Sequence, residues 1–141
     1  CPVYGLAMLA VLALGTESLP HLWERMALGA FAATVVEYAV HWGYETLFGV
    51  QFWDYSSTKC DVNGRVCLPF SLCWGVLSAL AVRYVQPVLE NYAARLPAGA
   101  AALAMFLVAL DGILTARVLL VTRDIDALTP RTLIRLRRRT A

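Results

Sequence analysis

The chain has 141 residues, of which 60% are apolar and only 16% are charged, and its mean hydropathy is +0.62. Soluble domains average about 45–50% apolar and about 25% charged residues, so this composition excludes a disordered chain and an ordinary soluble enzyme domain. A formal charge of +2 lacks the basic surface of a nucleic-acid binder, so we expect no nucleic-acid partner. The sequence therefore predicts an all-α integral protein of the cell membrane, with the lipid bilayer as its surroundings.

Four hydrophobic segments follow one another, at about residues 3–15, 21–49, 67–90 and 98–122. The first is shorter than the roughly 20 apolar residues that a spanning helix needs. The second carries ionisable residues in its second half, and we keep it as a span because those residues share one helix face. Residues 50–66 form a polar loop with aromatic residues suited to a membrane interface. We therefore predict a polytopic, multi-pass helical bundle over residues 1–128.

The C-terminal end of the chain is strongly basic. Residues 123–141 hold six arginines against two aspartates, a net +4, whereas the rest of the chain has a net −2. Basic segments next to a span stay on the cytoplasmic side, so we expect residues 129–141 to form a cytoplasmic tail. Counting back through four spans, loop 50–66 is cytoplasmic as well.

The most informative polar residues are Glu37, His41 and Glu45, which lie at i, i+4 and i+8 and share one helix face. Gly29 and Ala33 continue this face with small residues that allow close helix approach. Ionisable groups at membrane depth are costly and are often functional. Three interpretations stay open: a structural network of ion pairs and hydrogen bonds, a path for protons or substrate, and a metal site that would need ligands from other helices.

Depth along the segments indicates partners for this polar stripe. Because a helix rises about 1.5 Å per residue, Asp111 in the fourth segment is expected at the depth of Glu37. Two carboxylates there would repel unless one is protonated or a cation lies between them. Arg117 is expected to pair with Glu45. Arg83, near the outer end of the third segment, is expected at the level of Glu24, where the two charges would neutralise each other.

Several chemistries have no motif in this sequence. There is no GxxxxGK[ST] loop for nucleotides, no GxSxG elbow, no HExxH zinc helix and no CxxC pair. We therefore expect no bound metal or cofactor, and we favour a role other than that of an enzyme.

Residues 53–75 read WDYSSTKCDVNGRVCLPFSLCWG. This block resembles a bacterial family of small membrane proteins labelled putative ABC-transporter permeases of type IV. The family also has a Cys-Pro-Ile/Val-Tyr-Gly segment, here Cys1–Gly5, and a Glu-rich helix, here around Glu37 and Glu45. The resemblance covers about residues 1–90. It implies that a helix of the intact protein precedes the Cys-Pro segment and is missing from this chain, and that a separate ATPase subunit supplies energy.

The loop part of this block consists of seven residues: Trp53, Asp54, Tyr55, Ser56, Asn63, Gly64 and Arg65. The short polar side chains of Asp54 and Ser56 are expected to fold the loop by bonding backbone amides. The Asn63-Gly64 pair predicts a tight turn. Arg65 is expected to clamp an aspartate of the loop, or to hold a phosphate or lipid head group.

Together these features predict a permease-like component of a transporter, in which Glu37, His41, Glu45 and Asp111 line a path. The loop would gate this path or contact a partner, either the separate ATPase or a second copy of the chain. One alternative is a small membrane enzyme acting on a lipid or lipid-linked substrate, with Glu37 or His41 as acid or base and Arg65 as head-group binder. A non-catalytic assembly or scaffold subunit is another.

Overall fold

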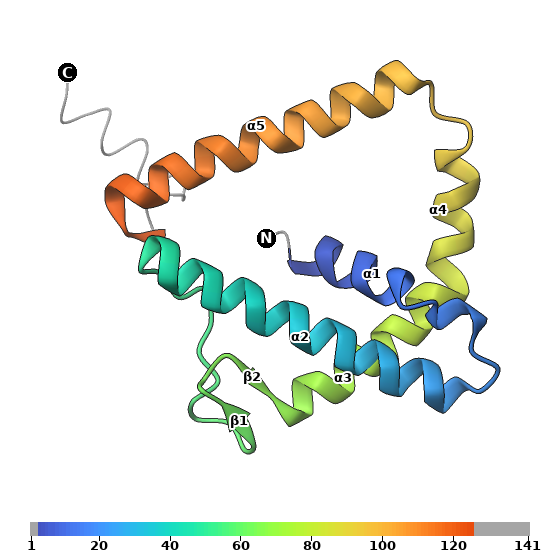
Figure 1. The fold of residues 1–141 in the computed structure, drawn as a ribbon, viewed down its shortest axis with the longest axis horizontal. Helices are drawn as coiled ribbons and strands as arrows, with labels where there is room; N and C mark the ends of the chain where they lie inside the picture. Colours follow the sequence, from blue (N-terminus) through green and yellow to red (C-terminus); the bar gives the residue numbers. More distant parts are fainter. Residues whose placement is uncertain (1–2, 126–141) are drawn as a thin grey trace. The chain divides into compact units, whose positions relative to one another are not determined.

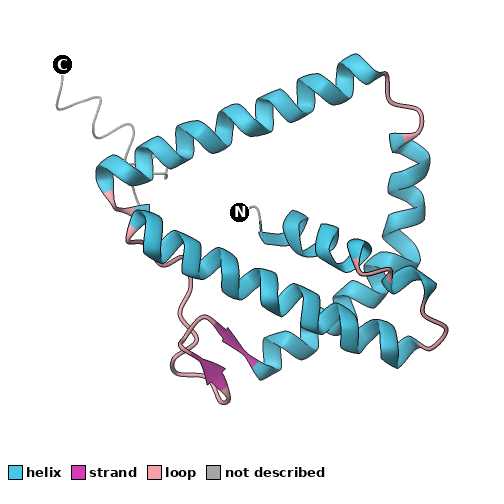
Figure 2. Ribbon diagram, in the orientation of Figure 1, coloured by secondary structure: helices cyan, strands magenta, loops and turns pink. Residues whose placement is uncertain are grey.

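A computed structural model describes residues 3–125 of the chain (Figure 1). Its five α-helices are α1 (Val3–Ala13), α2 (Leu22–Phe48), α3 (Leu68–Leu80), α4 (Gln86–Ala93) and α5 (Ala98–Thr122). The chain also has a 3-10 turn at Thr16–Ser18 and a π-helical segment at Ala81–Val85. Two short strands, β1 (Asp61–Val62) and β2 (Val66–Cys67), lie between α2 and α3 (Figure 2). Contacts divide the chain into two units, Cys1–Trp42 with Trp53–Arg95, and Gly43–Phe52 with Leu96–Ala141.

The helical fold class is confirmed, but four membrane spans are not. Two helices of the described part are long and apolar enough to cross a membrane: the continuous stretch Leu68–Ala93 and α5. The first helix has 11 residues, and α2 is diluted by charged side chains along its 27 residues. The predicted tail 129–141 and the first two residues of the Cys-Pro segment lie outside the described residues.

The third hydrophobic segment is one long helix with an irregular middle. Residues Ala81–Val85 form a π-helical turn, in which the Gln86 N–H bonds the Ala81 carbonyl five residues back. Pro87 follows immediately. Proline lacks an N–H, and its ring presses on the carbonyl four residues before it, so a widened turn lets the helix continue past it. The stretch therefore reaches Ala93 instead of ending near Pro87.

The two helices α2 and α3 approach closely where small residues meet. A Cβ added to Gly29 would lie 2.6 Å from the Ser78 Cβ, and one added to Gly75 would lie 2.7 Å from the Met26 carbonyl oxygen. A larger side chain at either glycine would force the helices apart. The apolar core beside this crossing is formed by Val11, Ala32 and Val82.

The polar loop predicted at 50–66 contains a small antiparallel hairpin that the sequence analysis did not include. Its strands pair Asp61 with Cys67 and Val62 with Val66. Asn63 and Gly64 have φ angles of 55° and 68°, the left-handed values that a type I′ hairpin turn requires at both central positions. The hairpin leads directly into the first turn of α3.

Candidate functional site

The polar face of α2 is turned into the first unit. Glu37 and His41 are only 5% and 4% exposed, and Gly29 and Ala33 on the same face are buried as well. Glu45, one turn further on, is half-buried. Burying a carboxylate is costly unless hydrogen bonds compensate, so the contacts of Glu37 decide how the site holds together.

Both carboxylate oxygens of Glu37 accept a hydrogen bond from an aromatic side chain. The Tyr55 hydroxyl donates to Oε1 at 3.2 Å, and the Trp74 indole N–H donates to Oε2 at 2.9 Å. Burial, reinforced by the negative charge of Glu37, raises the pKa of the Tyr55 phenol above its ordinary value. Tyr55 therefore stays a protonated donor throughout the physiological pH range. The two donors come from segments 18 and 37 residues away from Glu37.

The imidazole of His41 contacts the start of the same loop. Its Nε2 lies 2.9 Å from the Trp53 carbonyl oxygen, and the two rings meet edge to face with centroids 5.2 Å apart. Since a carbonyl oxygen only accepts, the geometry assigns the proton to Nε2. The Trp53 indole N–H in turn donates to the Arg65 carbonyl at 2.9 Å, which ties the two ends of the loop together.

Tyr38, next to Glu37 on α2, makes a third contact between this helix and the loop. Its hydroxyl accepts a hydrogen bond from Arg65 Nη1 at 2.8 Å and one from the Asn63 side-chain amide at 3.1 Å. The Arg65 guanidinium also lies over the Tyr38 ring, 5.1 Å from its centroid. This cation–π contact fixes the turn of the hairpin against the helix.

Within the motif loop, which we define as residues 53–67, the Asp54 carboxylate bonds a backbone N–H as expected, whereas the Ser56 hydroxyl bonds Asp54 instead of a backbone amide. Asp54 Oδ1 accepts the Ser56 N–H at 2.9 Å, and Oδ2 accepts the Ser56 hydroxyl at 3.1 Å. The backbone bond, and then the hydroxyl bond, lower the pKa of Asp54 below its ordinary value. A second carboxylate, Asp61, accepts the Gly64 N–H at 2.8 Å. A Cβ at Gly64 would lie 2.8 Å from Asp54 Oδ1, so a side chain there would displace this carboxylate.

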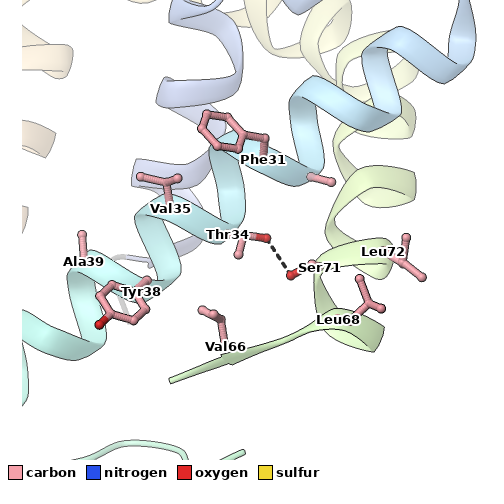
Figure 3. A pocket seen from close by; sticks show the side chains of 10 residues that line it. Phe31, Thr34, Val35, Tyr38, Ala39, Val66, Leu68, Ser71 and Leu72 are labelled. Atoms are coloured by element: carbon pink, nitrogen blue, oxygen red, sulfur yellow. Dashed lines mark hydrogen bonds between the residues drawn. The ribbon is translucent and has the colours of Figure 1, made fainter. Parts of the chain in front are cut away.

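The site lies beside the beginning of α3. Thr34 donates its hydroxyl to Ser71 Oγ at 2.9 Å (Figure 3). Ser71, in the first turn of α3, donates its hydroxyl to the Cys67 carbonyl. Glu37 and His41 follow Thr34 along α2 by one and two turns. They are therefore level with the N-terminal end of the apolar stretch Leu68–Ala93 or beyond it.

The hydrogen bonds described above do not include the remaining predicted residues, which are Glu45, Arg83, Asp111 and Arg117. Arg83 is exposed, and Asp111 and Arg117 are exposed on α5 in the second unit. Glu45 accepts a hydrogen bond from Gln51 at 3.1 Å. The pairings expected for these residues remain predictions. Within residues 3–125, no group of three or more His, Cys, Asp or Glu side chains could hold a metal ion.

Two residues of the site were missed by the sequence analysis. Tyr38 lies one position from Glu37 and off the i, i+4 stripe, so spacing gave no reason to select it. Trp74 lies in the third hydrophobic segment, outside the polar stripe of the second, yet its indole bonds Glu37. The available indication was that Trp74 belongs to the motif block of residues 53–75 and follows its loop closely.

These features define a class of protein. The described chain is helical, has two helices long and apolar enough to cross a membrane, and holds a buried carboxylate and histidine under an ordered loop, which is typical of a helical membrane protein with a polar site. Residues 1–116 match the model of the family described as Putative ABC-transporter type IV, and the chain belongs to that family. No curated protein and no solved structure matches the chain.

Proposed function

We propose that this chain is a membrane-embedded component of a transporter, whose polar site is closed by the motif loop at one membrane surface. Family membership supports the transport role. The sequence has no nucleotide-binding loop, so the energy would come from a separate ATPase subunit. The exposed apolar surface of α5 would face lipid or a second copy.

One observation carries this proposal: the loop covers the two buried ionisable residues of α2 through direct hydrogen bonds. Tyr55 holds Glu37, and the Trp53 carbonyl holds His41. Each such bond contributes about 1–3 kcal/mol, and lifting the loop would also break the contacts of Arg65 and Asn63 with Tyr38, so opening costs several kcal/mol. A partner that binds the open form more tightly supplies free energy of that size. The loop thus has the energetics of a gate that a partner can open.

Lifting the loop would expose a carboxylate and an imidazole on adjacent turns of one helix. Glu37 would lose both of its donors only if Trp74 on α3 also moved, whereas the loss of Tyr55 alone frees one oxygen. A carboxylate with one free oxygen can bind a cation, and an imidazole can pass a proton near neutral pH. In this proposal the open state conducts a cationic group or a proton past Glu37 and His41.

Accessibility of the buried face to water tests the proposal. We replace the native cysteines, introduce Ala33→Cys on the face of Glu37, and measure its labelling by a water-soluble methanethiosulfonate in native membranes. Ala33 is fully buried, so labelling is expected to be slow. It should accelerate when ATP is added or when Tyr55→Phe weakens the loop. Ser57→Cys, on an exposed loop residue, should react fast under every condition.

Labelling of Ala33→Cys that responds to neither ATP nor Tyr55→Phe would overturn the gate. The buried face would then be a permanently closed packing surface, as a scaffold subunit predicts. Labelling that is fast from the start would also overturn it, because the loop would not exclude water.

A further inference from the structure

A pocket of about 480 Å³ lies within the first unit, between α1 and the long helix Leu68–Ala93. This helix changes direction at its π-helical segment (Figure 1). The pocket follows the bend, since its lining includes Leu77 before the π-helical segment and Leu89 after it. A volume of this size is typical of a ligand-binding site.

The lining of this pocket combines apolar side chains with three aromatic rings. Tyr4 lines it from α1, Trp74 from α3 and Tyr84 from the π-helical segment, and none of its lining residues is charged. The rings of Tyr4 and Trp74 lie next to each other, with centroids 5.5 Å apart. The face of an aromatic ring is the negative pole of its quadrupole and attracts cations, with Trp the strongest. This lining therefore suits a ligand that has an apolar body and a positive charge.

The negative charge of Glu37 adjoins one of these rings. The Trp74 indole N–H donates to Glu37 Oε2, so the same ring borders the pocket and holds the carboxylate. Within residues 3–125, the partners of Glu37 are the neutral donors Tyr55 and Trp74 and, electrostatically, His41; no lysine or arginine is among them. An N–H that donates to a carboxylate is polarised, and its ring face becomes more attractive to a cation. Glu37 therefore acts on the pocket through Trp74, without lining it.

Position in the membrane favours an organic cation over an inorganic one. Trp74 is six residues into the stretch Leu68–Ala93, about 9 Å from its start, which places the pocket at hydrocarbon depth when this stretch spans the bilayer. A small inorganic ion would lose its hydration there, and no group of three or more metal-ligating side chains within residues 3–125 would replace it. An ammonium surrounded by alkyl groups is less strongly hydrated and binds well to ring faces.

We infer that this pocket binds a lipophilic alkylammonium ion, with the ammonium group against Trp74 and Tyr4 and the alkyl chain along Leu77 and Leu89. The inference rests on the proposed transport role and deepens it, because it names the class of cation that the site of Glu37 would pass. Tyr55, whose hydroxyl closes that site, also interacts electrostatically with Tyr4, so this end of the pocket adjoins the proposed gate.

Equilibrium dialysis of the full chain in phosphatidylcholine nanodiscs, with empty nanodiscs subtracted, tests the inference. The probe is octyltrimethylammonium, and an uncharged octyl ether and octyl sulfonate compete with it. We expect the chain to bind the ammonium and both competitors to displace it poorly. Trp74→Leu should weaken binding roughly tenfold, the factor that a desolvated cation–π contact is worth. Trp23→Leu, a well-exposed ring on α2 outside the pocket, is the matched control and should bind as the wild type does.

Two further pairs of variants separate the charge of Glu37 and the pocket itself from damage to the motif loop. Glu37→Gln should weaken ammonium binding several-fold, whereas Glu17→Gln, an exposed acid after α1, should not. Tyr84→Leu removes a half-exposed ring that lines the pocket, and Tyr92→Leu removes an equally exposed ring of α4 that does not. Only the first is expected to weaken binding. If Trp74→Leu or Glu37→Gln fails to fold, the tyrosine pair decides.

Equal competition by the octyl ether would overturn the inference, because the pocket would then hold any alkyl chain. Equal binding by Tyr84→Leu and Tyr92→Leu would overturn it as well. The assay contains no ATP, so this site and the gate fail separately. Gated labelling at Ala33→Cys in a chain without ammonium preference refutes this inference alone. Ammonium preference in a chain whose labelling never responds refutes the gate and leaves the binding site standing.

Discussion

Removing the hydroxyl of Tyr55 tests the contact between the motif loop and the buried carboxylate of Glu37. Tyr55→Phe keeps the ring, which stacks on Phe70 with centroids 4.8 Å apart, and removes only the donor to Glu37 Oε1. A hydrogen bond to a charged group contributes about 1.5–3 kcal/mol, and the freed oxygen stays buried, so we expect a loss of about 2 kcal/mol. Tyr92→Phe removes a hydroxyl from a well-exposed ring, and its effect should stay within about 0.5 kcal/mol.

A double-mutant cycle attributes that loss to Glu37. In a Glu37→Gln background the bond from Tyr55 is neutral, so the same change should cost only about 1 kcal/mol. The assay is reversible unfolding in dodecylmaltoside micelles titrated with dodecyl sulfate, followed by circular dichroism. The coupling between the two positions should be about 1 kcal/mol. A coupling near zero would refute our assignment, because Tyr55 would then stabilise the loop by some other contact.

Two further predictions follow from single positions. Gly75→Ala should destabilise the protein by about 1–3 kcal/mol, because the new Cβ would lie 2.7 Å from the Met26 carbonyl oxygen. Gly112→Ala has open space around it and should be neutral or stabilising by up to about 1 kcal/mol. Equal unfolding midpoints for the two variants would contradict the close crossing of α2 and α3. The pKa of Asp54 is lowered by the Ser56 N–H, so its contribution to stability is present above the ordinary carboxyl pKa of about 3.9 and is lost as pH falls through the lower folded value. Between about pH 5 and pH 3 the wild type should therefore lose more thermal stability than Asp54→Asn, and identical pH profiles would argue against the bond.

The inward face of α2 follows from the sequence because helical spacing defines a face. Gly29, Ala33, Glu37 and His41 recur every four residues, and the structure buries all four. Spacing does not say what covers a face. Tyr55 and Trp74 reach Glu37 from far along the chain, and only tertiary folding brings them there.

The hairpin illustrates a second limit. The Asn63-Gly64 pair indicated the turn, since left-handed backbone conformations favour these two residues. Its strands have two residues each, too few for the alternation that identifies a strand. They exist because the turn and the packing of Val66 and Cys67, both buried, hold them in place.

The number of spans could not be derived from hydropathy alone. Along α2, small and polar residues share the buried face, and the charged ones dilute an otherwise apolar helix. A helix that packs this face inward can still expose Phe31, Val35 and Trp42, which are all at least half exposed. Average hydropathy mixes the two faces, so it undervalues such a helix. The expectation that Glu37 and Asp111 lie at the same depth used only the position of each residue along its helix, and it stays a prediction.

The motif block of residues 53–75 is best understood as one clamp on α2. Trp53 bonds His41, Arg65 bonds Tyr38, and Tyr55 and Trp74 bond Glu37, so each part of the block engages a polar side chain of the helix. An apolar side chain in place of Glu37 would hold a loop without the desolvation penalty of a carboxylate, which is several kcal/mol and which two hydrogen bonds only offset. A clamp that served stability alone therefore has no need of a buried charge. The buried charge of Glu37 and its two separate donors are therefore the physical argument for the gate that we propose at this site.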